Sequence, residues 1–311
     1  MRKTRIVISG LGAVGGYYGG LLAKHYNQSD SVEIIFIARG ENLQIIQAKG
    51  LTIKTSKGNI KAQPTLVTDN PAEVGVADYL FCCTKSYDLE ANMAQLAPLI
   101  GEDTTIIPLL NGADITERIQ QILPQHEVWK GCVYIGSRLV KPGVVNKFSE
   151  KERLFFGSEK GSKARQQELL SLLTNAGINA FNPENIAERI WKKFFMISTA
   201  ATITAYFNQP IDKVIDQHYD MFVSLGLELR DVAAAKSIVL PDEIVFTSIE
   251  LQKMMPNGAT TSMHTDFKKG KNTELESLTG YVIRAGEELG VATPTYRFMY
   301  NGLVVFPYPQ E

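Results

Sequence analysis

Near its N-terminus the chain reads Ile6-Val7-Ile8-Ser9-Gly10-Leu11-Gly12-Ala13-Val14-Gly15. An apolar strand pattern thus passes directly into a Gly-x-Gly-x-x-Gly turn that opens a helix pattern. In this context Gly10 permits the tight turn, Gly12 lets a pyrophosphate approach the backbone, and Gly15 lets the helix pack closely on the strand. Free N–H groups at the start of the helix would face the phosphates. We therefore predict that residues 10–15 bind a dinucleotide; a purely structural glycine turn is the alternative.

The residue at the end of the next strand indicates which dinucleotide binds. The pattern predicts this strand over Val32–Ile37, followed by Ala38-Arg39-Gly40. NAD-preferring sites normally carry an acidic side chain here for the ribose hydroxyls, whereas an arginine suits a 2′-phosphate. Arg39 therefore predicts NADP(H) as the cofactor; a solvated loop arginine is the alternative.

The composition is that of an ordinary globular protein. The chain has 311 residues, of which 44% are hydrophobic and 21% charged, and a formal net charge of −1. One large or two ordinary domains fit, and neither nucleic acid nor a membrane surface is expected as a partner. Cys82, Cys83 and Cys132 show no metal-binding or disulfide spacing, so we expect buried thiols and no metal. Because no signal peptide pattern and no apolar run of about 18 residues is found, we expect a cytoplasmic protein.

The first half of the chain alternates strand and helix patterns. Strands are predicted at 78–84, 104–110 and 128–135, although Pro108 argues against full pairing of the second. Such alternation is typical of a mostly parallel sheet with right-handed crossovers. Two short strands at 144–148 and 153–156 and a helix at 164–175 follow.

Beyond about residue 185 the patterns are helical nearly throughout. The expected helices cover 186–207, 213–235, a segment from Pro241, 261–289 and 294–303. We therefore predict an α/β protein of two domains. Residues 1–184 form an N-terminal Rossmann-type, doubly wound parallel sheet that binds NADP, and residues 185–311 form an all-helical domain for substrate and catalysis.

Polar residues follow several of the predicted strands. Gly10, Arg39, Lys85 and Asn111 all lie at carboxyl ends, where sheets of this kind bind nucleotides. Lys85 would add a second cation for a 2′-phosphate, and Asn111 would offer an amide on the nicotinamide side. A surface lysine and a turn asparagine before glycine are the alternatives.

The helical half must then supply the chemistry. Lys193 stands among Trp191, Phe194 and Phe195, and partial desolvation would lower its pKa and make it a proton donor near neutral pH. Lys192 would point elsewhere on the helix. A lysine whose stem packs while its amine reaches water is the alternative.

A second polar stretch begins at Thr261-Ser262-Met263-His264-Thr265. A hydroxyl that opens a helix, with free N–H groups beside it, is suited to a carboxylate. Glu274 would lie 12 residues beyond Ser262 on the same helix, roughly three turns further along, and the pattern alone predicts a solvated carboxylate there. His264 is a candidate acid, but no partner acid can be identified for it.

Together these residues resemble the ketopantoate reductase (2-dehydropantoate 2-reductase) family over essentially the full chain. The resemblance rests on their order and spacing: Gly10 to Gly15, Arg39, Thr84-Lys85, Asn111-Gly112, Trp191-Lys192-Lys193, and Ser262-Met263 through Asn272-Thr273-Glu274. It implies an NADPH-dependent reduction of a 2-keto acid to a 2-hydroxy acid in pantothenate synthesis.

The resemblance also implies roles for individual residues. Arg39 and Lys85 would grip the 2′-phosphate, Asn111 would be the cofactor asparagine, and Ser137 would contact the cofactor through its backbone. Lys193 matches the proton donor, and Glu274 matches the acid near the cofactor and the lysine. Ser262 begins a substrate-binding stretch that continues through Met263, His264 and Thr265.

The chain departs from the family at three substrate positions. Ile197, Ala201 and Ile211 stand where the family often has asparagines, and the spacing of four keeps the first two on the helix face of Lys193. Each lost donor costs about 1–3 kcal/mol unless it is replaced. Nearby candidates for replacement are Ser198, Thr199, Thr202 and Asn208.

The favoured function is therefore reduction of ketopantoate to pantoate with NADPH. The nearest rival is a related NADP-dependent reductase of a more apolar 2-keto acid, and a rival of another class is a non-catalytic NADP(H)-sensing protein. The expected partner is a small 2-keto acid, and a homodimer is left open.

Overall fold

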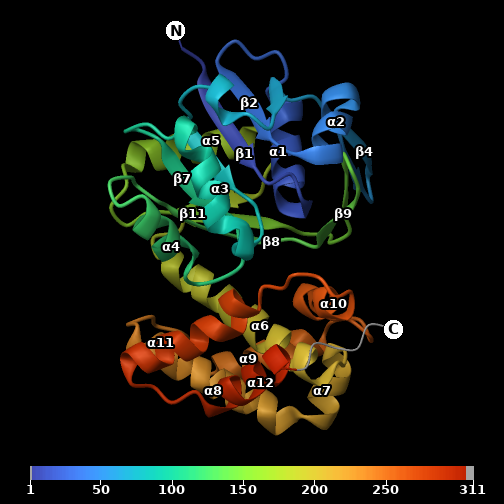
Figure 1. Cartoon of the computed structure of the whole chain (residues 1–311), viewed down its shortest axis with the longest axis vertical. Coiled ribbons are helices and arrows are strands. Elements are labelled where there is room, and N and C mark those ends of the chain that lie inside the picture. The colour runs from blue at the N-terminus through green and yellow to red at the C-terminus, as the bar shows by residue number, and fades with distance from the viewer. Residues whose placement is uncertain (1, 306–311) are drawn as a thin grey trace. The chain divides into compact units, whose positions relative to one another are not determined.

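The computed structural model describes residues 2–305 (Figure 1). Its internal contacts divide the chain into two compact units. The first comprises the chain up to Leu110 together with Ile115–Ile186, and the second comprises Asn111–Asp114 and the chain from Ala187 onward. Asn111 thus belongs by its contacts to the second unit, although it follows a strand of the first.

A five-stranded parallel sheet forms the centre of the first unit. The strands are ordered β5-β2-β1-β6-β7, with bounds β1 (Thr4–Ser9), β2 (Val32–Ile37), β5 (Leu66–Thr68), β6 (Tyr79–Cys82) and β7 (Thr105–Pro108). The chain winds outward from β1 in one direction through β2 and β5, then in the other through β6 and β7. The predicted doubly wound parallel sheet is therefore confirmed, and its winding direction changes between β1 and β6, where such sheets bind ligands.

Both faces of this sheet are buried, as the continuous apolar strand patterns require. Ile6 and Ile8 belong to the same buried cluster as Tyr18 of α1, whereas Val7 belongs to the cluster that contains Leu89 of α3. The helices of this unit are α1 (Ala13–His25), α2 (Gly40–Lys49), α3 (Leu89–Leu96), α4 (Ile115–Ile122) and α5 (Lys163–Asn175). Alternate residues of β1 therefore point into different cores.

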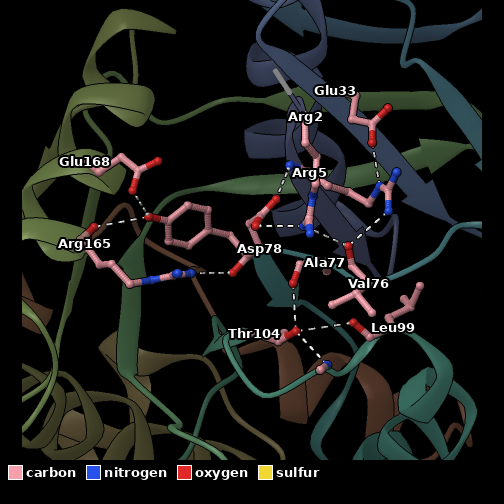
Figure 2. Close-up of polar contacts among 12 residues, drawn as sticks. Arg2, Arg5, Glu33, Val76, Ala77, Asp78, Leu99, Thr104, Arg165 and Glu168 are labelled. Carbon is pink, nitrogen blue, oxygen red and sulfur yellow. Dashed lines mark hydrogen bonds and ion pairs between the residues drawn. The ribbon is translucent and has the colours of Figure 1, made fainter.

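Polar contacts join the amino ends of the central strands (Figure 2). Asp78, just before β6, accepts a hydrogen bond from the backbone N–H of Arg5 in β1 (2.7 Å), and Arg5 pairs with Glu33 of β2 (2.5 Å). The Thr104 hydroxyl, just before β7, donates to the carbonyl of Ala77 (2.7 Å). These contacts hold four strands in register, so their opposite, carboxyl ends share one edge.

Two smaller sheets also belong to the first unit. One is ordered β4-β3-β10-β9, with β3 (Leu51–Thr55), β4 (Gly58–Ala62), β9 (Ser137–Lys141) and β10 (Val144–Lys147); the other is ordered β12-β11-β8, with β8 (Lys130–Tyr134), β11 (Arg153–Gly157) and β12 (Ala180–Phe181). The two short predicted strands thus form in different sheets. The strand predicted at 128–135 forms outside the central sheet, to which Val128 adds a single parallel bridge. Pro108 ends the outer strand β7, where a missing N–H is tolerated.

The second unit is helical, as predicted. Its elements are α6 (Ile186–Phe207), α7 (Ile211–Gln217), α8 (Tyr219–Ala235), α9 (Ile244–Lys253), α10 (Ser262–Lys268), the π-helix η4 (Glu276–Gly280), α11 (Tyr281–Leu289) and α12 (Pro294–Val305). Among the described residues, no helix is both long and apolar enough to cross a membrane.

Two helix predictions in this unit were wrong in extent. The helix expected over 213–235 is divided at His218, whose φ of −134° and ψ of 32° are not helical. The helix expected over 261–289 ends at Lys268, because Gly270 adopts a left-handed φ of +59°. Glu274 therefore does not lie on the helix that Ser262 begins.

Candidate active site

The first and third glycines of the N-terminal turn are required by close backbone contacts. Gly10 has φ +89°, and a β-carbon on it would lie 2.7 Å from the backbone of Cys83 and Thr84. A β-carbon on Gly15 would lie 2.2 Å from the carbonyl oxygen of Gly10. These two glycines therefore let the start of α1 pack against the ends of β1 and β6.

The middle glycine faces open space instead. No described atom lies within 4 Å of the position that a β-carbon on Gly12 would occupy. Gly12 is the residue before α1, and no side chain caps that helix. Uncapped N–H groups beside an open backbone fit a phosphate, because the start of a helix carries partial positive charge.

A cavity of about 360 Å³ opens at these strand ends. Its lining comprises Ser9, Gly10, Leu11, Gly12, Ile37, Ala38, Arg39, Asn42, Thr84, Asp88, Ala91, Asn92, Gln95 and Leu139. The hydroxyl of Thr84 is buried and has no hydrogen-bond partner within residues 2–305. A buried polar group in this condition costs about 1–3 kcal/mol, which a bound polar ligand can offset. The residues present therefore fit a dinucleotide.

The predicted cofactor residues differ in their relation to this cavity. Arg39 borders it, is largely exposed, and lies 3.5 Å from a carboxylate oxygen of Asp88. Lys85 is half-buried and does not line the cavity, although its neighbour Thr84 does. The Ser137 hydroxyl donates to the carbonyl of Ala13 (3.3 Å), so this residue contacts the glycine turn itself.

Several cavity residues were not predicted from the sequence. Asn42 donates to the carbonyl of Leu11 (3.0 Å) and accepts from the N–H of Gly143 (2.7 Å), which ties the turn to other segments. Asn92 donates to the hydroxyl of Ser9 (2.8 Å) inside the sheet edge. Asn42 follows the end of β2 by five residues, which is a signal that could have identified it, whereas Asn92 lies within α3, ten residues after the end of β6, and no spacing pointed to it.

In the second unit, Lys193 is buried on α6 and held by a hydrogen bond. Its side chain is 8% exposed, and its ammonium donates to the side-chain oxygen of Asn111 at 2.9 Å. An ammonium group can only donate, so the Asn111 oxygen must face it. Lys192 instead pairs with Glu188 on its own helix, which confirms that the two neighbouring lysines point in different directions.

Glu274 is buried in the same unit, against the expectation of a solvated carboxylate. It is 3% exposed, whereas Glu276 is exposed and pairs with Arg284 (2.7 Å). The pattern failed here because Glu274 lies in the connection between α10 and η4, where helical periodicity says nothing about burial.

The stretch from Ser262 to Thr265 begins α10. Thr261 caps this helix by accepting from the N–H of His264 (3.2 Å). Ser262 is exposed and Thr265 half-buried, while Met263 and His264 are buried. Met263 and His264 therefore face the core, Ser262 is accessible to a ligand, and the Thr265 hydroxyl donates to the carbonyl of Thr261 (3.0 Å).

His264 is held at both ring nitrogens. Its Nδ1 contacts the Thr260 hydroxyl (2.5 Å), and its Nε2 contacts the side-chain oxygen of Asn208 (2.9 Å). Because that oxygen accepts, Nε2 carries the proton and the hydroxyl donates to Nδ1. Burial, followed by the charge of Lys268, lowers the pKa of His264. These contacts fix the orientation of the ring, and the lowered pKa favours its neutral form.

At the three positions where the family often has asparagines, the neighbouring hydroxyl groups do not replace the missing donors. Ala201 and Ile211 are buried and Ile197 is half-buried. Three of the four candidates for replacement donate to or share hydrogen bonds with protein atoms instead: Ser198 bonds Leu278 and Tyr296, Thr199 bonds Phe195, and Thr202 bonds Thr279. Asn208 is exposed, and its side-chain oxygen contacts His264. This part of the second unit is therefore more apolar than an asparagine-lined site.

Comparison with known proteins matches most of the chain to one family. Residues 6–161 match the family described as ketopantoate reductase PanE/ApbA, and residues 185–304 match the C-terminal part of that family. The chain is 42% identical to the solved structure of 2-dehydropantoate 2-reductase from Porphyromonas gingivalis W83, covering 97% of this chain and 100% of that chain with a TM-score of 0.86.

Of two other similar proteins, one is an uncharacterized oxidoreductase and one is a D-mandelate dehydrogenase. The uncharacterized oxidoreductase YkpB of Bacillus subtilis (strain 168) is 26% identical over 97% of this chain and 98% of its own. The fold is also shared with D-mandelate dehydrogenase, solved with NADH and anilino(oxo)acetate, at 24% identity, 97% coverage of each chain and a TM-score of 0.85.

Proposed function

Since the chain belongs to the ketopantoate reductase family of oxidoreductases, we propose that it reduces a 2-keto acid to a 2-hydroxy acid with NADPH. The specific reaction proposed is ketopantoate to pantoate, a step of pantothenate biosynthesis. The observation that carries this proposal is the buried ammonium of Lys193, held at 2.9 Å by Asn111.

The proposed chemistry assigns one task to each group. Bound NADPH supplies the hydride that the keto carbon accepts. Lys193 polarises the carbonyl and gives a proton to the developing alkoxide, and its burial strengthens this electrostatic stabilisation. Asn111 orients the ammonium, and Glu274 is proposed from the family resemblance as the acid near it.

Binding is proposed to use residues in both halves of the chain. The glycine turn would hold the pyrophosphate, and Arg39 and Lys85 would hold the 2′-phosphate. Ser262, with its exposed hydroxyl, and the N–H groups at the start of α10 would bind the substrate carboxylate, whereas the Thr265 hydroxyl already donates to the carbonyl of Thr261 (3.0 Å). The opening at Gly12 and the unpartnered hydroxyl of Thr84 support the nucleotide part of this assignment.

A steady-state assay with ketopantoate and NADPH tests the catalytic assignment. Replacement of a general acid typically costs about 10²–10⁴-fold in rate, and we expect such a fall in kcat for Lys193→Ala. Lys192→Ala is the matched control, because Lys192 pairs on the helix surface with Glu188. Equal turnover by Lys193→Ala and the wild type would refute the role of Lys193.

A second candidate function is reduction of a more apolar 2-keto acid. It is favoured by Ile197, Ala201 and Ile211, and by the internal hydrogen bonds of the neighbouring hydroxyls. Trimethylpyruvate differs from ketopantoate by a methyl in place of a hydroxymethyl group, so the ratio of kcat/KM for the two separates the candidates. Tight NADPH binding without turnover of any 2-keto acid would instead support a non-catalytic NADP(H)-sensing protein.

A further inference from the structure

Two charged side chains face each other in the nucleotide cavity. Of the described residues that line this cavity, Arg39 and Asp88 are the two that carry charge, and the Arg39 guanidinium lies 3.5 Å from a carboxylate oxygen of Asp88. Arg39 follows β2 and Asp88 follows β6, so the pair joins two strand ends across the cavity. An anionic group that binds Arg39 therefore lies close to the negatively charged carboxylate of Asp88 and competes with it for the guanidinium.

The local structure leaves the Asp88 carboxylate free for this contact. Asp88 is the last residue of the turn η2 (Ser86–Asp88) and directly precedes α3. Aspartate at this position usually accepts from N–H groups of the helix that follows, yet the Asp88 side chain makes no such capping bond. Its carboxylate therefore contributes to the cavity rather than to the start of α3.

The two charges have opposite effects on the two nicotinamide dinucleotides. A 2′-phosphate gains from Arg39, which offers a planar fork of donors, but is repelled by a carboxylate at the same place. A free ribose 2′-hydroxyl has no such penalty, since a carboxylate accepts its hydrogen bond, as acids do in NAD-binding sites. A site with Arg39 alone would favour NADPH strongly, whereas the pair reduces that preference.

We propose that Asp88 sets the choice between NADPH and NADH by competing with the 2′-phosphate for Arg39 and by offering an acceptor to the ribose hydroxyls. The chain would accordingly accept both dinucleotides. This inference rests on the proposed function, because it assumes that Arg39 is the 2′-phosphate ligand.

Calorimetric titration of the full chain with 2′,5′-ADP and with 5′-ADP tests the proposal. Because solvent screens this exposed pair, we expect Asp88→Asn to tighten 2′,5′-ADP by about three- to tenfold and to leave 5′-ADP unchanged or slightly weaker. The matched control is Glu90→Gln in the first turn of α3, which removes the same charge two positions along the chain; Glu90 pairs with Arg118 and does not line the cavity.

The double variant Arg39→Ala/Asp88→Asn completes the design. If Asp88 acts through Arg39, then Asp88→Asn adds nothing to 2′,5′-ADP binding once Arg39 is alanine. If Asp88→Asn changes the affinity for both nucleotides equally, or if Glu90→Gln changes them in the same way, the proposed role of Asp88 is refuted but the 2′-phosphate site at Arg39 is not. If Arg39→Ala leaves 2′,5′-ADP binding unchanged, the proposed 2′-phosphate site fails and this inference fails with it.

Discussion

Gly15 and Gly12 belong to the same turn, yet the structure predicts different results when each becomes alanine. A β-carbon on Gly15 would lie 2.2 Å from the Gly10 carbonyl oxygen and 2.9 Å from the β-carbon of Cys83. Contacts of a β-carbon below 3.0 Å are essentially never found. Because the nearest atom is backbone, the start of α1 must move away from the strands.

The expected cost of Gly15→Ala follows from this contact. Overpacking of a close contact costs about 1–3 kcal/mol of unfolding free energy, and a backbone neighbour that cannot rotate away favours the upper part of that range. The displaced helix start also carries the N–H groups proposed to hold the pyrophosphate. We therefore expect Gly15→Ala to lower both stability and NADPH affinity.

Gly12→Ala is the internal control for this reasoning. Nothing described lies within 4 Å of the added β-carbon, so stability should change by no more than about 0.5 kcal/mol, as for other uncrowded surface sites. The methyl group would nevertheless occupy the space proposed for the pyrophosphate, and NADPH binding should weaken markedly.

Urea unfolding and fluorescence titration with NADPH measure the two effects separately. Wild-type stability in Gly15→Ala would contradict the steric argument. Wild-type NADPH affinity in Gly12→Ala would contradict the placement of the pyrophosphate at this turn.

Three further predictions concern the second unit. The pKa of His264 is lower in the native state than in the unfolded chain. As the pH falls through the unfolded-state pKa of about 6.5, the unfolded chain therefore takes up a proton that the native state resists, and the unfolding free energy should fall. Urea unfolding from pH 7.5 to 5 should show a smaller fall for His264→Gln than for the wild type. Ser198→Ala removes the 2.8 Å partner of the buried Tyr296 hydroxyl and should cost about 1–3 kcal/mol in urea unfolding, whereas exposed Ser171→Ala should cost far less. Ile197→Asn restores a donor on the face of α6 and should raise kcat/KM for ketopantoate relative to trimethylpyruvate, and an unchanged ratio would count against a substrate-facing position.

Local chemistry accounts for the features that could be predicted well. The run from Ile6 to Gly15 predicted a strand, a turn and a helix, because the strand and helix periods differ and only glycine tolerates the contacts found at Gly10 and Gly15. Arg39 could likewise be placed at a strand end by counting along the chain. The doubly wound sheet follows from such local signals repeated in order.

Features that depend on distant segments could not be predicted in the same way. The strands β10 and β11 were found, but sequence neighbours gave no reason for them to join different sheets. Glu274 was expected in solvent and is buried, because burial outside a periodic element depends on what the rest of the fold packs against it. The Arg39–Asp88 pair also joins segments 49 positions apart, whose contact depends on strand order rather than on spacing.

The sequence by itself therefore determined the class of the fold, the dinucleotide turn and the identity of the residues proposed for chemistry. Tertiary structure alone decided which of them meet: Lys193 with Asn111, Arg39 with Asp88, and the hydroxyls of α6 with neighbouring helices rather than with open space. The physical reason is the separation along the chain over which each kind of interaction acts. Strand and helix periods and glycine turns act over a few residues, whereas the contacts that orient a charge or bury it are made between segments far apart in the chain.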